Sequence, residues 1–305
     1  MRGTVVFDLD GTLETPYLEK PEDVEAVRKY VVAKYGAAMF DRMFTTVLGG
    51  MPHFFLNGAL ELLRWCHDQG LQIVFFSNAV RSRNEDLCPI LMERAFSGVA
   101  VPGYRLFSRP DCIDRSHGEC DKDEIDGLWG GGYKKKLAGV VVPEDKVGDT
   151  LMIEDDSSYA CKGEERNFIY GEYGGSANEY LLYEALGKGH GNGTRVLSFH
   201  LPFWFCGMIK RTLAIAGMEK LSLADAAVHA LYADKAGEFP VDGEYPEDMK
   251  GWESREKIPR PPVRDFEVYK EGLVELRTIN PDLKFWGAID ESAADWPEWA
   301  KDRYW

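Results

Sequence analysis

The sequence predicts an α/β fold built on a doubly wound parallel sheet, and three observations favour it. Short apolar runs typical of strands alternate in the first half of the chain with segments of helical spacing. Three of these runs end in polar side chains, and parallel sheets of this kind place their ligands at such strand ends. The chain of 305 residues, 45% of them hydrophobic, is large enough for one sizeable core with an appendage.

Strands are expected where apolar runs are short and bounded by polar or glycine residues. The opening run from Thr4 to Phe7 consists of strand-type residues and leads into a tight turn. Residues 71–76 are apolar apart from Gln72, as in a strand that is buried on both faces. The same criteria predict further strands at residues 104–108, 150–154 and 166–170.

Helices are expected between and after these strands. Residues 21–35 begin with Pro21, which suits a first turn, continue with acidic residues, and carry valines along one face. Residues 57–68 have apolar residues at helical spacing, and Gly70 provides a stop signal. Helical patterns also cover residues 87–96, 178–186, 203–216, 223–232 and 268–276, with a short helical piece at 134–137.

This pattern divides the chain into two parts. Residues 1–175 are expected to form the α/β core, in which residues 13–57 make at most a small helical cover and residues 109–132 an insertion loop. Residues 176–305 are expected to form a helical and irregular extension that packs on the core. Because large aromatic residues mostly supply buried area, its tryptophans are expected to pack inward: Trp286, Trp296, Trp299 and Trp305.

The composition limits the classes of partner. A net charge of -15 argues against nucleic acid as the main partner, because proteins that bind its backbone normally carry positive charge. The longest apolar stretch, residues 201–209, is too short to cross a bilayer. Six dispersed cysteines indicate reduced thiols, and the first strand begins too close to Met1 for a signal peptide. A cytoplasmic protein is expected, and its oligomeric state is left open.

Asp8 and Asp10 follow the opening strand one residue apart and give the strongest chemical signal in the sequence. Because side chains alternate along a strand, both are expected to project to the same side as the strand ends. Two like charges held that close need a cation or a shared proton between them. Gly11 allows a sharp turn, and Thr12 adds a hydroxyl and a backbone amide. The pattern is typical of a carboxylate nucleophile for phosphoryl transfer; the alternative is a pair of turn carboxylates.

Two other predicted strands also end in polar residues. Ser77 and Asn78 follow residues 71–76, and Asp155 and Asp156 follow residues 150–154. Because parallel strands present their carboxyl ends at one edge of the sheet, these side chains are expected to meet Asp8 and Asp10. The alternative interpretation makes Ser77 and Asn78 a simple turn and Asp156 a helix cap.

The run Asp8-Leu9-Asp10-Gly11-Thr12-Leu13 resembles the first motif of the haloacid dehalogenase superfamily. Ser77 fits its second motif, a lysine among residues 134–136 the third, and Asp155-Asp156 the fourth, in the required order. The resemblance covers roughly residues 1–175 and implies the Rossmann-like core of that superfamily.

The resemblance implies a role for each motif residue. Asp8 is the expected nucleophile that forms an aspartyl-phosphate, and Asp10 the acid for the leaving group and the base for water. The implied cofactor is Mg²⁺, held by the Asp8 carboxylate, the Asp10 backbone carbonyl and Asp155, with Asp156 either a ligand or a supporting neighbour. The expected phosphate-binding residues are Thr12, Ser77, Asn78 and Lys135, with Lys134 as the rival of Lys135.

Within the superfamily, residues 133–137 and 153–157 resemble the branch of RNA-polymerase C-terminal-domain phosphatases and NLI-interacting-factor-like proteins. Ser77 stands where that branch usually has Thr, and Lys136 replaces its usual acidic residue. The resemblance implies an Mg²⁺-dependent phosphatase that acts on a phosphoprotein. Because residues 13–57 are too few for a large cap, the cleft is expected to be open, which suits a macromolecular phosphoester. The alternatives are a small-molecule phosphatase and a non-enzymatic docking module that uses the C-terminal extension.

Three further features of the sequence are given less weight as functional sites. Cys112, His117 and Cys120 are three potential zinc ligands, but their spacing fits no standard zinc finger. The glycine-rich run at residues 187–194 lacks the lysine of a phosphate-binding loop and is interpreted as a flexible connection. His53, His200 and His229 are expected to be packed or surface histidines rather than catalytic ones.

Overall fold

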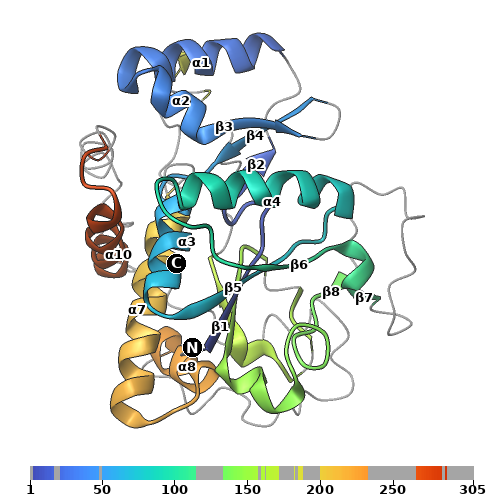
Figure 1. Ribbon diagram of the computed structural model, residues 1–305. Helices are drawn as coiled ribbons and strands as arrows, with labels where there is room; N and C mark the ends of the chain where they lie inside the picture. The colour runs from blue at the N-terminus through green and yellow to red at the C-terminus, as the bar shows by residue number, and fades with distance from the viewer. Residues whose placement is uncertain are drawn as a thin grey trace.

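The computed structural model contains a central five-stranded parallel sheet (Figure 1). Its strands lie in the order β10-β9-β1-β5-β6. Their bounds are β1 Gly3–Phe7, β5 Leu71–Phe76, β6 Arg105–Phe107, β9 Thr150–Glu154 and β10 Phe168–Tyr170. The structure describes residues 3–16, 21–47, 50–114, 133–156, 159–161, 163–171, 182, 185–187, 200–232, 266–283 and 286.

The order of the strands confirms the predicted doubly wound topology. From β1 the chain moves outward to β5 and β6, and then returns to the other side of β1 to form β9 and β10. The strand order therefore reverses between β1 and β9, and in open α/β sheets ligands bind at the carboxyl ends beside such a point. Phe7 pairs with Ile153, so the chain leaves both strands at this point at nearly the same height.

Alternate residues of each central strand bury into opposite layers. In β1, Val5 and Phe7 join the larger apolar cluster, while Val6 joins the smaller one. Helices α3 (Ala59–Asp68), α4 (Arg81–Ala95), α7 (Leu201–Glu219), α8 (Leu223–Tyr232) and α10 (Phe266–Ile279) contribute to the larger cluster. The smaller cluster is covered by residues 133–142 and Ala160, without a long helix among the described residues.

Helices α7 and α10 lie side by side against the core (Figure 1). Residues 201–209 of α7 are all buried, so this helix is apolar on every side along its first half. Gly207 of α7 and Gly272 of α10 allow the close approach, because a Cβ on either would overlap backbone of the other helix. The predicted helical character of the C-terminal region is thus present, and Trp286 is buried against Phe203.

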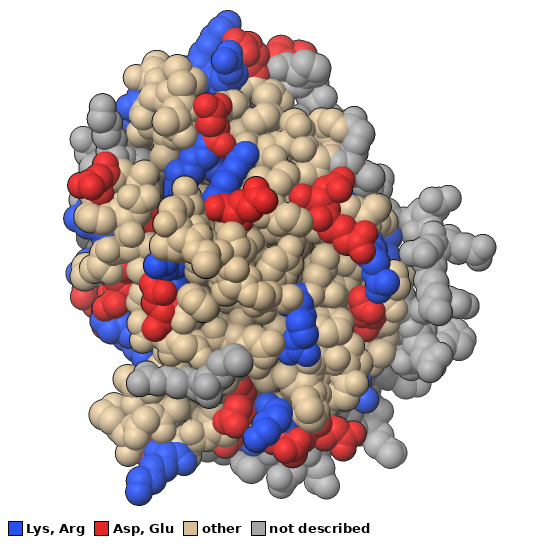
Figure 2. Space-filling model, in the orientation of Figure 1, with Lys and Arg blue, Asp and Glu red and all other residues tan. Residues whose placement is uncertain are grey.

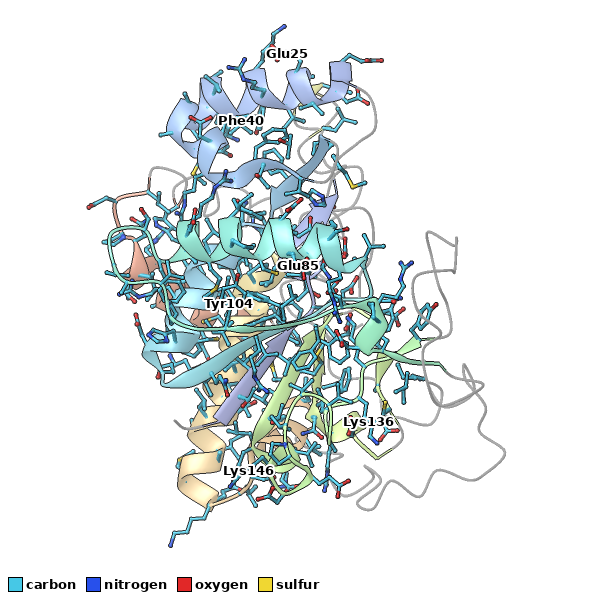
Figure 3. All side chains as sticks on the ribbon, turned by 45° about the vertical axis from the view of Figure 1, so that its right-hand side comes forward. Glu25, Phe40, Glu85, Tyr104, Lys136 and Lys146 are labelled. Atoms are coloured by element: carbon cyan, nitrogen blue, oxygen red, sulfur yellow. The ribbon has the colours of Figure 1, made fainter. Side chains whose placement is uncertain are left out.

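The segment that follows β1 forms a small cover beyond the carboxyl end of that strand (Figure 1). It consists of β2 (Glu14–Pro16), α1 (Pro21–Tyr35), α2 (Ala37–Met43), β3 (Phe44–Val47) and β4 (Met51–Phe55). Its strands form an antiparallel sheet in the order β2-β4-β3. Phe40 of α2 stacks on Phe44 and contacts Phe54, whereas Glu25 points outward from α1 (Figure 3).

The cover therefore contains a sheet and the helix α2 besides the helix that the sequence predicts at residues 21–35. Its strands are only three to five residues long and include Pro16 and Pro52, so their period-2 signal is weak. Aromatic contacts between α2 and the sheet stabilise them instead, which is a tertiary effect.

The prediction of a helical piece at residues 134–137 is wrong. Tyr133–Lys134 form strand β8, paired with β7 (Ile113–Asp114), and Lys135 continues with a bridge to Ala160. Burial alternates along the segment: Tyr133 and Lys135 are buried, and Lys136 is exposed. Extended backbone directs only Lys135 of the three lysines inward, because successive side chains of a strand point to opposite faces.

Several sequence predictions fall outside the described residues. They include most of the predicted helix at 178–186, the glycine-rich run after Gly187, and Trp296, Trp299 and Trp305. Within the insertion 109–132, the structure describes residues 109–114, which form the short 3-10 helix η1 (Arg109–Asp111) and β7. Further 3-10 helices are η2 (Glu144–Asp149) and η4 (Glu165–Asn167). Among the helices described, none has the length and apolarity needed to cross a bilayer.

Candidate functional site

The site forms where β1 and β9 end, at the point where the strand order reverses. The chain turns sharply after β1, with the Gly11 amide donating to the Glu14 carbonyl at 2.8 Å and the Leu13 amide to the Leu9 carbonyl at 2.9 Å. This turn places Asp8 and Asp10 against different neighbours, because regular strand geometry ends at Phe7. The Asp8 side chain is buried, and the Asp10 side chain is 39% exposed.

Lys135 is the cation that faces Asp8. Its Nζ lies 2.5 Å from Asp8 Oδ1 and 2.6 Å from Glu154 Oε2, and its side chain is fully buried. The ammonium also lies 4.5 Å from the centre of the Tyr159 ring. Although burial opposes the charge, the two carboxylates raise the pKa of Lys135, so the amine is protonated. The structure thus places Lys135 at the site, while Lys134 is half-buried and Lys136 is exposed (Figure 3).

Glu154 belongs to the site and was not among the predicted site residues. Besides Lys135, it accepts hydrogen bonds from the backbone amides of Asp155 at 3.2 Å and Asp156 at 3.4 Å. Both of its oxygens are therefore used to hold Lys135 and the turn after β9. A charged residue that ends the apolar run Leu151-Met152-Ile153 is the sequence signal that could have revealed it.

Asp8, Glu154 and Asp155 form an acidic cluster that could hold a metal ion. Ligand oxygens from the three residues all lie within 4.8 Å of one another. Burial, with the charges of neighbouring carboxylates, raises the pKa of Asp8 and of Glu154, and burial together with Asp8 raises the pKa of Asp155 to about 8. One lysine does not neutralise three carboxylates, so the cluster is short of positive charge. All-oxygen donors of this kind fit a hard divalent cation.

Gly11 makes room for this cluster. Its φ of +78° is readily adopted by glycine, and a Cβ at this position would overlap Oδ2 of Asp155. The cluster of ligand oxygens does not include Asp156, which the sequence proposed as a further ligand.

Asp10 is held by a second buried cation, Arg83 of α4. The guanidinium donates to both carboxylate oxygens, at 2.6 and 2.7 Å, and Ser77 Oγ donates to Asp10 Oδ2 at 3.2 Å. Burial alone would raise the pKa of Asp10, but the charge and hydrogen bonds of Arg83 outweigh it and hold that pKa below its ordinary value. The sequence placed Ser77 at the site but did not identify Arg83.

Arg83 also contacts the cover. Its guanidinium donates to Glu14 of β2, and Glu14 Oε2 lies 2.7 Å from Nδ1 of His53 in β4. Both Glu14 and His53 are fully buried. His53 was expected to be a packed or surface histidine; it is packed, and it is hydrogen-bonded to the carboxylate that holds Arg83.

Thr12 lies in the turn after β1, and Asn78 follows β5 beside Ser77. Among the described residues, Thr12 Oγ1 and Asn78 Oδ1 are buried and have no hydrogen-bond partner. The side-chain Nδ2 of Asn78 donates to the Tyr159 hydroxyl at 3.3 Å. Arg109 donates to the backbone carbonyl of Asn78 at 3.0 Å. A buried polar atom that lacks a partner is costly, so these two oxygens suit a site that receives a polar ligand or water.

The alternative zinc site is not tested by the structure. Cys112 is buried with its Sγ 3.9 Å from the Ser108 carbonyl, while His117 and Cys120 lie outside the described residues. Within the described part of the chain, the grouped potential metal ligands are those of the acidic cluster.

Fold and site together define an α/β protein with a buried acidic cluster at the reversal point of a parallel sheet. No family model matches the sequence, and a search of the curated proteins finds no match either. Among solved structures, a hydrolase from Pseudomonas syringae is similar at 15% identity, over 64% of this chain and 90% of that chain, with a TM-score of 0.24. A similarity at this TM-score does not assign an activity to this chain.

Proposed function

We propose that this protein is an Mg²⁺-dependent phosphatase that hydrolyses a phosphate monoester through an aspartyl-phosphate on Asp8. The observation that carries the proposal is the pairing of buried Asp8 with Lys135 inside an acidic cluster that is short of positive charge. A second carboxylate, Asp10, lies on the neighbouring turn and is oriented separately by Arg83. A nucleophile, a cation site and an acid–base group are the parts that this reaction needs.

The residues present fit a magnesium ion. Because both Glu154 oxygens are engaged, the ligands would be the Asp8 and Asp155 carboxylates, with the Asp10 backbone carbonyl as the third protein ligand that the resemblance implies. When bound, the ion would neutralise charge between the carboxylates and the phosphoryl group. Glu154 would keep Lys135 directed toward Asp8, since it holds the ammonium from the opposite side.

In the first half of the reaction, an Asp8 oxygen attacks phosphorus and the bond from phosphorus to the leaving oxygen breaks. Asp10 gives its proton to that leaving oxygen. Arg83 favours the ionised form of Asp10 in the free protein, but the negative charge of an incoming phosphate raises the pKa of a nearby carboxyl group. Lys135 stabilises the charge that gathers on the transferred phosphoryl group.

In the second half, Asp10 takes a proton from water, and the water oxygen attacks the phosphorus of the aspartyl-phosphate. The bond between phosphorus and the Asp8 oxygen breaks, which releases inorganic phosphate and restores both carboxyl groups. Thr12 and Asn78 are the proposed contacts for the phosphoryl group, since both carry a buried oxygen that has no hydrogen-bond partner among the described residues. Because an acceptor such as Asn78 Oδ1 cannot bind an ionised oxygen, its expected partner is a water or a protonated oxygen.

The proposed substrate is a phosphorylated protein, with a small phosphorylated metabolite as the alternative. On the face shown in Figure 2, acidic and basic side chains are interspersed, and within the site Lys135 supplies the positive charge that would meet phosphate. A panel of phosphopeptides and phosphorylated metabolites separates the two substrate classes.

The decisive assay is hydrolysis of p-nitrophenyl phosphate by the purified full chain, with Mg²⁺ and with a chelator. We expect Mg²⁺-dependent turnover that falls at least about 1,000-fold in Asp8→Asn, because the nucleophile is lost. Asp68→Asn is the matched control, since this exposed carboxylate pairs with Arg64 at the end of α3, before β5 begins, whereas the site lies beyond the other end of that strand. Equal turnover by the wild type and Asp8→Asn contradicts the proposal.

A further inference from the structure

Arg83 is a buried charged side chain outside the acidic cluster, and it donates hydrogen bonds to three other side chains. It lies in the first turns of α4, and its side chain is 5% exposed. Its guanidinium donates to both Asp10 oxygens, to Glu14, and to Asn84 Oδ1 at 3.1 Å. The planar guanidinium thus donates hydrogen bonds to three different residues, and these bonds fix its position.

The contact with Glu14 joins the core to the cover. Glu14 begins β2, and His53 lies in β4, the neighbouring strand of the antiparallel sheet. Both side chains are fully buried and lie 2.7 Å apart, so Glu14 has one oxygen toward His53 and one toward Arg83. The order of contacts is therefore His53, Glu14, Arg83 and Asp10, from the inside of the cover to the candidate site.

Such a chain is expensive to bury. The Glu14 carboxylate and the Arg83 guanidinium lose most of their hydration, and apolar residues of similar size often stabilise a core better. Its geometry is nevertheless suited to one task, because a bidentate contact fixes the orientation of a carboxylate as well as its position. Without that contact, Asp10 would be free to turn toward solvent, since its side chain is partly exposed.

We propose that Arg83 is a positioning residue that holds the Asp10 carboxylate in the orientation for proton transfer, with Glu14 and His53 anchoring the guanidinium from the cover. The inference rests on the proposed phosphatase function and assigns no contact between Arg83 and substrate. It predicts that Arg83 acts through Asp10, and therefore matters most where the leaving oxygen needs a proton.

The test compares phosphate monoesters whose leaving groups differ in basicity. A p-nitrophenolate leaves without help, whereas an alkoxide from an alkyl phosphate needs protonation, which general acids typically accelerate about 100- to 10,000-fold. In Arg83→Gln we expect kcat/KM to fall about 100-fold or more for propyl phosphate and less than about 10-fold for p-nitrophenyl phosphate. The matched control is Arg81→Gln, an exposed arginine of the same helix that pairs with Asp111, and both activities should persist in it.

A double-mutant cycle separates positioning from a general structural role. Because Arg83 acts through Asp10, Arg83→Gln should cause little further loss with propyl phosphate when added to Asp10→Asn. A structure of Arg83→Gln should also show the Asp10 side chain displaced. Arg83→Lys keeps a buried positive charge and is the variant to use if Arg83→Gln does not fold. Its kcat/KM for propyl phosphate should also fall selectively, by at least about 10-fold, because one ammonium cannot hold both Asp10 oxygens in the same way.

The outcomes distinguish this inference from the proposed function. Absence of turnover by the wild type with every phosphate monoester overturns both. If the wild type is active but Arg83→Gln or Arg83→Lys loses activity equally for both leaving groups, the positioning role alone is overturned. A loss that is fully additive with that of Asp10→Asn also overturns it. An unmoved Asp10 carboxylate in the structure of the variant does the same.

Discussion

At the scale of single residues, the site depends on short distances between its charged groups. Lys135 lies between Asp8 and Glu154, and Asp155 approaches the turn at Gly11 because glycine has no side chain there. Buried ionisable groups at such distances are stable only with matched partners, so small changes in shape should affect the site strongly.

Gly11→Ala is the residue-scale test of this close approach. We expect weaker Mg²⁺ binding and at least about 10-fold lower phosphatase activity, because the added Cβ pushes Asp155 away from Asp8. Calorimetric titration with Mg²⁺ and the p-nitrophenyl phosphate assay measure the two effects. Gly139→Ala is the matched control, since Gly139 has the same φ of +78° but open space around it. The clash argument fails if the two variants bind Mg²⁺ equally well.

At the scale of elements, two kinds of packing position the site. Strands β1 and β9 bring their ends together through parallel pairing from Thr4 to Phe7, while α7 and α10 support the helical layer through close backbone contact. The glycines of these helices have different surroundings: Gly272 faces the Phe203 backbone, and Gly217 of α7 faces open space.

Replacing these two glycines by alanine should change stability in opposite directions. Gly272→Ala should destabilise the protein by about 1–3 kcal/mol, because the added methyl group forces the two helices apart. Gly217→Ala should stabilise it by up to about 1 kcal/mol, because alanine has the higher helix propensity and nothing obstructs it. Urea unfolding followed by circular dichroism measures both, and a stabilising effect of Gly272→Ala would refute the close-contact interpretation.

At the scale of the whole molecule, the charge of the site links stability to pH and to metal. The formal net charge is -15, and the acidic cluster adds local repulsion in the interior. Burial and the charge of Asp8 raise the pKa of Asp155 from 3.8 to about 8, and the pKa values of Asp8 and Glu154 shift in the same direction. Between these pH values the metal-free folded state binds more protons than the unfolded state.

The sign of the pH dependence follows from this difference. The contribution of the cluster to the stability of the metal-free protein should decrease as pH rises from about 4 to about 8, because the folded state must then lose protons that the unfolded state has already lost. Mg²⁺ competes with those protons, so its effect on stability should grow as the pH rises past the Asp155 pKa of about 8. We expect 5 mM Mg²⁺, roughly a saturating concentration for a site of ordinary affinity, to raise the melting temperature more at about pH 8.5 than at about pH 6.

Differential scanning fluorimetry with and without the ion measures this shift. Asp155→Asn should remove most of the Mg²⁺ effect at both pH values, because the variant lacks a proposed ligand. Asp156→Asn is the comparison variant, since the cluster of ligand oxygens does not include Asp156. An Mg²⁺ effect that is larger at the lower pH would contradict the proton competition.

Local sequence patterns were sufficient for most of the core. The apolar run of β5 matches its predicted bounds of 71–76, and the helices α1 and α8 match theirs, because a strand or amphipathic helix that buries its apolar residues carries its own periodicity. The three short strands of the cover and the direction of Lys135 did not follow from such patterns. In both cases the backbone conformation depends on contacts with distant segments, such as the bridge between Lys135 and Ala160.

The sequence by itself determined the α/β class, the strand ends that carry Asp8, Ser77 and Asp155, and the motif that suggests phosphoryl transfer. Only the tertiary structure decided which lysine faces Asp8, that Glu154 joins the acidic cluster, and that Arg83 holds Asp10. The physical reason is that a strand end is set by neighbouring residues, whereas an ion pair joins side chains that are far apart along the chain. Lys135 and Asp8 are separated by 127 positions, and Arg83 and Asp10 by 73, so their contacts exist only after the sheet has formed.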